Sequence, residues 1–138
     1  MTMATKDPLI GRKARINEDA TTLKGGRSDN RDLVTELKNK GYSYAASKEE
    51  LAAADSSKRL IGLFNDSHLS YDLDRANGKA PTEPSLTEMT TKAIEVLSKK
   101  DKGFFLMVEG GRIDHALHDT NAKRALQDTV AFDNALKA

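Results

Sequence analysis

The sequence predicts an α/β fold, a portion of a mainly parallel sheet with flanking helices. Short apolar runs at 42–45, 60–64 and 104–108 alternate with longer amphipathic stretches, and strands that alternate with helices favour parallel pairing. The 138 residues suit a single domain, and a chain of this length can bury a core without disulfides. Because the sequence contains no cysteine, neither a disulfide nor a thiolate metal site is available.

Capping residues define the predicted helices. Residues 1–28 are polar and rich in turn residues, so we expect an irregular N-terminal arm before a partial α/β domain at 29–138. Short side-chain oxygens that can accept from free amides mark the helix starts of that domain. The predicted helices begin at Asp29 or Asn30 and end near Asn39 before Gly41, span 48–54 after the Ser47–Glu50 capping box, and run from the Ser85–Glu88 capping box to about Lys99.

The rest of the chain gives two further predictions. The polar stretch 65–84 contains Gly78, Pro81 and Pro84 and predicts a long, mobile loop. A last helix is predicted from Asp114 or Asp119 onward, with apolar residues facing inward. Its predicted end is Leu136, and the inward positions are Ala122, Ala125, Leu126, Val130 and Leu136.

Charge and motif content exclude several classes of function. The 22 basic and 21 acidic residues give a net charge of +1, so there is no net positive field to attract nucleic acid. The apolar run 104–108 is far shorter than the roughly 20 residues that span a bilayer, and residues 1–8 lack the apolar core of a signal peptide. Neither glycine-rich nucleotide-binding pattern occurs, nor does the Gly-x-Ser-x-Gly pattern of serine hydrolases.

The most informative segment begins where the run 104–108 ends. Glu109 follows that run directly, and Gly110 and Gly111 allow the backbone to turn sharply. Because ligands of open parallel sheets bind at the carboxyl ends of the strands, Glu109 is a candidate ligand. Its hard carboxylate oxygen suits Mg²⁺.

An acid and an imidazole follow at helical spacing. Asp114 and His118 are four residues apart, which places both side chains on one face of a helix. An oxygen and a nitrogen donor at that spacing can share one Zn²⁺, although zinc needs further ligands from elsewhere. His115 and Asp119 repeat the spacing on an adjacent face.

Each of these residues also has an ordinary structural interpretation. Asp114 and His118 can make a simple side-chain hydrogen bond, or Asp114 can cap the helix. Glu109 can be a solvated carboxylate, and Arg112 a surface cation or the partner of Asp114. His68 has no identifiable orienting group and suits a loop position. Under this interpretation the chain is a non-catalytic module of α/β fold that binds a divalent metal or a partner.

A longer pattern around these residues indicates a family. Residues 104–115 read Phe-Phe-Leu-Met-Val-Glu-Gly-Gly-Arg-Ile-Asp-His, with a histidine at 118 and Thr-Val-Ala-Phe-Asp-Asn-Ala at 129–135. This pattern resembles alkaline phosphatase, and 103–134 is its most specific part. Upstream segments agree in order, so the resemblance covers nearly the whole chain after about residue 10. They are 11–13, 30–34, 60–64 and 84–90.

The resemblance implies a reaction and a set of cofactors. The family hydrolyses phosphate monoesters through a phosphoserine intermediate, with two Zn²⁺ ions and one Mg²⁺ ion. It implies that Glu109 binds Mg²⁺ and that Asp114 and His118 bind one Zn²⁺. It also implies a homodimer and a periplasmic or secreted location. A related metallohydrolase of sulfate esters or phosphodiesters agrees less well with 103–134.

Parts of the family pattern do not occur in this sequence. The family carries its nucleophile in an Asp-Ser-Ala motif, which this sequence lacks. Its phosphate-binding arginine belongs to the same preceding region, and the remaining zinc ligands follow the segment matched here. We therefore expect an internal fragment with no catalytic residue of its own, inactive in isolation. Its metal affinity should be weak, and it should be marginally stable or prone to association.

Overall fold

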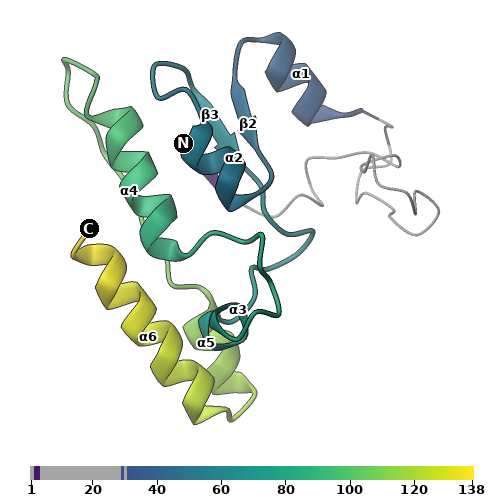
Figure 1. Ribbon diagram of the computed structural model, residues 1–138, viewed down its shortest axis with the longest axis vertical. Coiled ribbons are helices and arrows are strands. Elements are labelled where there is room, and N and C mark those ends of the chain that lie inside the picture. The colour runs from purple at the N-terminus through teal and green to yellow at the C-terminus, as the bar shows by residue number, and fades with distance from the viewer. Residues whose placement is uncertain (1, 4–28, 30) are drawn as a thin grey trace.

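The computed structural model describes residues 2–3, 29 and 31–138 of the chain. Among the described residues, a small sheet is surrounded by helices (Figure 1). The elements are β1 (Thr2–Met3), α1 (Leu33–Asn39), β2 (Ser43–Ala45), α2 (Lys48–Ala53), β3 (Leu60–Gly62), α3 (Asp72–Ala76), α4 (Leu86–Leu97), α5 (Arg112–His118) and α6 (Ala122–Leu136). Of the predicted irregular arm, Thr2 and Met3 form β1, and the remainder lies outside the described residues.

The sheet is parallel, and its strand order is β1-β3-β2. Tyr44 of β2 pairs with Ile61 of β3, and Met3 of β1 pairs with Gly62. Parallel neighbours need crossover connections, and helices provide such connections in α/β proteins. The predicted α/β class with a mainly parallel sheet is therefore confirmed.

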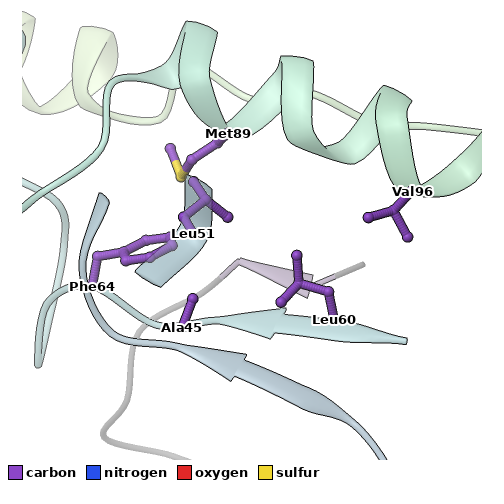
Figure 2. Close-up of a cluster of buried hydrophobic side chains, with 6 residues drawn as sticks. All are labelled: Ala45, Leu51, Leu60, Phe64, Met89 and Val96. Atoms are coloured by element: carbon purple, nitrogen blue, oxygen red, sulfur yellow. The ribbon is translucent and has the colours of Figure 1, made fainter. Parts of the chain in front are cut away.

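The core lies on both faces of β3. Leu60 faces the side covered by α2 and α4, where six buried side chains form one cluster (Figure 2). Ile61 points to the opposite face and packs with Val34 of α1 and with Leu63. Successive side chains of a strand point to opposite faces, so a strand covered on both sides is apolar throughout, as the run 60–64 predicts. The six residues of Figure 2 are Ala45, Leu51, Leu60, Phe64, Met89 and Val96.

Two of the predicted capping boxes mark true helix starts, and the first helix starts later than predicted. The Ser85 hydroxyl accepts from the amide of Glu88, whose carboxylate accepts from the amide of Ser85. Ser47 likewise caps α2 by accepting from the amide of Glu50. The cap of α1 is Asp32 rather than Asp29 or Asn30. Its carboxylate accepts from two free amides at the helix start, those of Val34 and Thr35.

Two predictions about the later helices were wrong in part. The stretch 65–84 is not entirely a loop, since it contains α3. The helix predicted from Asp114 or Asp119 onward is two helices, because Thr120 between them has φ 51°, which does not fit a right-handed helix. α6 packs against α4, and its other neighbours are α3 and α5 (Figure 1).

The inward face of α6 also differs from the prediction. Ala125 is buried as expected, whereas the other predicted inward residues are exposed. The positions that do face inward include Asp128 and Ala135. The apolar stripe therefore does not mark the packed face, because that face meets polar groups of α3 and α5. The exposed positions are Ala122, Leu126, Val130 and Leu136.

The run 104–108 is not a strand. It has no regular secondary structure, and none of the described strands pairs with it. Phe105 and Met107 are 88% and 73% exposed. A strand needs a hydrogen-bonded neighbour, and the described part of the sheet ends at β2 on one side and β1 on the other.

Candidate metal site

Asp114 and His118 lie on one face of α5 and point into solvent. The Nε2 atom of His118 is 3.5 Å from Oδ1 of Asp114. The two side chains are 79% and 74% exposed, so neither is enclosed in apolar packing. Both lone-pair-bearing groups are therefore open to an incoming ion.

The separation of these two atoms is informative. Tetrahedral zinc, with bonds of about 2.0–2.2 Å, holds two of its ligand atoms about 3.3–3.6 Å apart. The 3.5 Å between Nε2 of His118 and Oδ1 of Asp114 lies within that range. A carboxylate oxygen and an imidazole nitrogen are also donors that zinc accepts. The pair thus fits two positions of a zinc site without any movement of the helix.

Glu109 lies apart from this pair. It is exposed, immediately before the turn that leads into α5. Its carboxylate bends back over Gly111, because Oε1 lies 3.5 Å from the position that a Cβ atom on Gly111 would take. Within 2–3, 29 and 31–138, no group of three or more acidic or histidine side chains is arranged to hold a metal ion. Glu109 and the Asp114–His118 pair are therefore two separate partial sites.

The structure decides against one of the structural interpretations. Asp114 does not cap α5, because the helix begins two residues earlier, at Arg112, and its N-cap is Gly111. Arg112 is not paired with Asp114 either. Its guanidinium lies over the ring of Tyr71, with the central carbon 3.8 Å from the ring centroid.

The second acid–imidazole pair of α5 is separated by other contacts. The ring of His115 lies 4.3 Å from the ring of His68, between centroids. Nδ1 of His115 is 3.0 Å from a guanidinium nitrogen of Arg112. The Asp119 carboxylate instead accepts a hydrogen bond of 2.7 Å from the hydroxyl of Tyr71. His68 thus has an orienting neighbour that the sequence did not indicate.

Tyr71 is the residue near this helix that sequence reasoning missed. It is buried, and the hydrogen bond that it donates to Asp119 raises the pKa of its hydroxyl, as does its burial. The two residues are 48 positions apart in the chain. No local pattern relates residues at such a distance, so only the tertiary structure could reveal this contact.

The two glycines before α5 differ in their surroundings. A Cβ atom on Gly110 would lie 3.0 Å from Cδ1 of Ile113 and 3.3 Å from the side chain of Phe132. A Cβ on Gly111 would meet only the Glu109 carboxylate, at ordinary contact distance. The close backbone approach that the glycine pair predicts therefore occurs at Gly110, and it is an approach to α6.

The fold and the candidate site together define a class of protein: an α/β protein with a parallel sheet that carries an acid–imidazole pair on an exposed helix. A family model described as alkaline phosphatase matches residues 9–138. The chain belongs to the alkaline phosphatase family.

Individual relatives agree with this assignment. The chain is 44% identical over 131 residues to the membrane-bound alkaline phosphatase of Bombyx mori, an alignment that covers 89% of this chain and 23% of that protein. It is 42% identical over 126 residues to the human tissue-nonspecific isozyme, covering 86% of this chain and 24% of the isozyme. The chain thus spans about a quarter of the length of these relatives.

Crystal structures of family members are similar in fold. The alkaline phosphatase of Thermus thermophilus superposes with a TM-score of 0.76 at 40% identity, over 80% of this chain and 23% of that one. A cold-active enzyme from Shewanella sp. gives a TM-score of 0.67 at 28% identity, over 93% of this chain and 27% of that one. None of the described helices is long and apolar enough to cross a membrane.

Proposed function

We propose that this chain is the part of an alkaline phosphatase that supplies metal ligands for the hydrolysis of phosphate monoesters. Asp114 and His118 would hold one of two Zn²⁺ ions, and Glu109 would bind Mg²⁺. The observation that carries the proposal is the 3.5 Å between Nε2 of His118 and Oδ1 of Asp114, which fits tetrahedral zinc. Family membership supports it, because the reaction of alkaline phosphatases is phosphomonoester hydrolysis.

The roles of the chain's own residues follow from their positions. The Asp114 carboxylate and the His118 imidazole offer one oxygen and one nitrogen donor from successive turns of α5. Glu109 offers its carboxylate from the turn before the helix. Divalent cations at such ligands neutralise charge that builds up on the attacking and leaving oxygens of a phosphoryl group.

The same proposal covers what the sequence does not contain. The chain has no Asp-Ser-Ala motif, so the nucleophilic serine that becomes phosphorylated and the phosphate-binding arginine would come from outside this segment. By itself the chain should be a weak metal-binding module without turnover. A homodimeric assembly in a periplasmic or secreted location belongs to the same proposal.

Zinc binding by the chain tests the ligand assignment directly. We expect the imidazole signals of His118 in NMR spectra to shift saturably as Zn²⁺ is added. In Asp114→Asn the same shift should require at least about ten times more zinc, since removing a ligand costs no less than removing one of its supporting groups.

A matched control is available on α6. Asp133 pairs with Lys137 at the same helical spacing and is also exposed, so Asp133→Asn should leave the zinc titration unchanged. An unaltered titration of His118 in Asp114→Asn would show that the two residues do not share an ion.

The catalytic part of the proposal is tested in a chimera. Residues 9–138 would replace the matching segment of the full-length Thermus thermophilus enzyme, with zinc and magnesium supplied. We expect the chimera to hydrolyse p-nitrophenyl phosphate, and the isolated chain to show no turnover. Asp114→Asn in the chimera should lower kcat/KM at least about tenfold. An active chimera that is indifferent to this substitution would contradict the assignment, as would turnover by the isolated chain.

A further inference from the structure

Tyr71 contacts both ends of the short helix that carries the candidate zinc ligands. Its side chain is 6% exposed. The guanidinium of Arg112, the first residue of α5, lies 3.8 Å from the ring centroid. The phenol hydroxyl donates a hydrogen bond of 2.7 Å to Asp119, which directly follows the last residue of α5. One side chain thus touches the beginning and the end of the helix.

A second guanidinium closes the other side of this contact. Arg124, in the first turn of α6, lies 4.5 Å from the ring centroid of Tyr71. It is held by Asp74 of α3, whose carboxylate is 2.7 Å away. Guanidiniums near aromatic rings are attracted to the ring electrons, and more strongly where water is excluded. Tyr71 therefore links α5 to α3 and α6 through charged groups rather than through apolar packing alone.

The helical geometry separates the Tyr71 side of α5 from the ligand side. At 3.6 residues per turn, Arg112, Ala116 and Asp119 fall on one face. Ala116 is fully buried in a cluster with Tyr71 and Ala125. Asp114 and His118 fall on the opposite face, which is open to solvent. Contacts with Tyr71 can therefore fix the helix without covering the ligands.

Helix α5 depends on such an anchor. It has only seven residues and no side-chain N-cap, and isolated helices shorter than about 12 residues are marginal in water. Within the described part of the chain, Nε of Arg112 is buried without a hydrogen-bond partner. The guanidinium is instead held by the ring of Tyr71 and by the contact of 3.0 Å with His115.

We propose that Tyr71 is the positioning residue of α5, which fixes both ends of the helix and so holds Asp114 and His118 in place on the opposite face. The statement about the ligands rests on the proposed function, whereas the statement about the helix does not. Tyr71 itself is not a ligand, because it lies on the buried side.

The experiment separates positioning from general stability. Tyr71→Phe removes the hydroxyl and leaves the ring between the guanidiniums. Asp119→Asn keeps an acceptor for the hydroxyl but removes the charge. The control is Tyr42→Phe, because Tyr42 has the same chemistry elsewhere: its ring lies near the guanidinium of Arg59, whose nitrogen donates to the Tyr42 hydroxyl at 3.3 Å.

The first measurement is amide hydrogen exchange, followed by NMR in the metal-free chain. In Tyr71→Phe, amides of α5 should exchange about fivefold faster, the change expected from one lost hydrogen bond. Exchange in α4 should not change. Asp119→Asn should give a smaller increase, and Tyr42→Phe should leave α5 unchanged. The inference is overturned if α5 exchanges as in the wild type, or if every helix accelerates by the same factor.

The second measurement is the zinc titration of His118 in the same variants. We expect Tyr71→Phe to raise the zinc concentration at the midpoint by a factor similar to its effect on α5 exchange. Faster exchange with an unchanged midpoint would show that Tyr71 anchors the helix without positioning the ligands, and would overturn the proposal. If His118 of the wild type does not respond to zinc, the proposed function fails, and hydrogen exchange alone decides whether Tyr71 positions α5.

Discussion

Gly110 and Gly111 are adjacent, yet their side-chain-free positions have different consequences. A methyl group on Gly110 would press on Ile113 and Phe132, with its nearest atom at 3.0 Å. A methyl group on Gly111 would meet only the flexible Glu109 carboxylate at 3.5 Å. The backbone of Gly111 is already helical, so alanine fits there without strain.

This difference gives a prediction at the scale of one residue. Gly110→Ala should lower the free energy of unfolding by about 1–3 kcal/mol, the usual cost of overpacking. Gly111→Ala should change it by less than about 1 kcal/mol, because alanine also restricts the unfolded chain. Urea unfolding followed by circular dichroism compares the two variants, and equal losses would show that the turn, not the contact with α6, needs glycine at position 110.

The residues around the candidate site were predictable to different degrees. The i, i+4 spacing of Asp114 and His118 follows from chain geometry once the segment is helical, so the sequence alone indicated a shared face. The contacts of Arg112 and His68 depend on Tyr71 and His115, which neighbouring segments of the chain bring together. Sequence spacing carries no information on such contacts, and for these residues it indicated surface positions instead.

At the scale of elements, α6 shows why an apolar stripe can mislead. Asp128 faces inward, and its carboxylate oxygens lie 3.3 and 3.4 Å from the backbone amide of Asp72, which donates to them. This polar contact joins α6 to the start of α3. Leu126 and Val130 remain exposed on the other side of the helix. The packed face is therefore selected by partners on neighbouring elements.

The contact between α6 and α3 should make stability depend on pH. Burial raises the pKa of Asp128 above its ordinary value of 3.8, and the amide of Asp72 only partly opposes this effect. The folded chain thus binds this proton more tightly than the unfolded chain. The contribution of Asp128 to stability is complete below the ordinary value and is lost as pH rises through the raised pKa.

Asp128→Asn tests this dependence, because asparagine still offers an oxygen to Asp72 but carries no charge. The variant should be more stable than the wild type at pH 7, and the difference should shrink as the solution is acidified. Urea unfolding at a series of pH values measures it. Asp133→Asn, at an exposed position of the same helix, is the control. A variant that is less stable than the wild type at pH 7 would contradict this account.

At the scale of the whole molecule, the segment 104–108 is the main departure from the predicted fold. Its apolar run was expected to form a strand, but Phe105 and Met107 are largely exposed. Contiguous exposed apolar side chains are unusual on soluble monomers and favour association. The family's sheet is larger than the part described here, since the chain spans only 23% of the Thermus thermophilus structure that it matches.

We therefore expect the isolated chain to associate through this segment as its concentration rises. The double substitution Phe105→Ser and Met107→Ser should lower the average mass measured by light scattering after size-exclusion chromatography. Leu136→Ser, at an exposed apolar position of α6, should have a smaller effect. A wild-type chain that stays monomeric at all concentrations would disprove the expectation.

The sequence by itself determined the local elements and the family. Capping residues located the starts of α2 and α4, and the apolar run 60–64 located the strand buried on both faces. These features are local, because caps and strand periodicity act within a few residues. The tertiary structure alone decided the inward face of α6, the unpaired state of 104–108 and the anchoring of α5 by Tyr71. Each of these depends on a partner many residues away, and no periodicity in the chain specifies that partner.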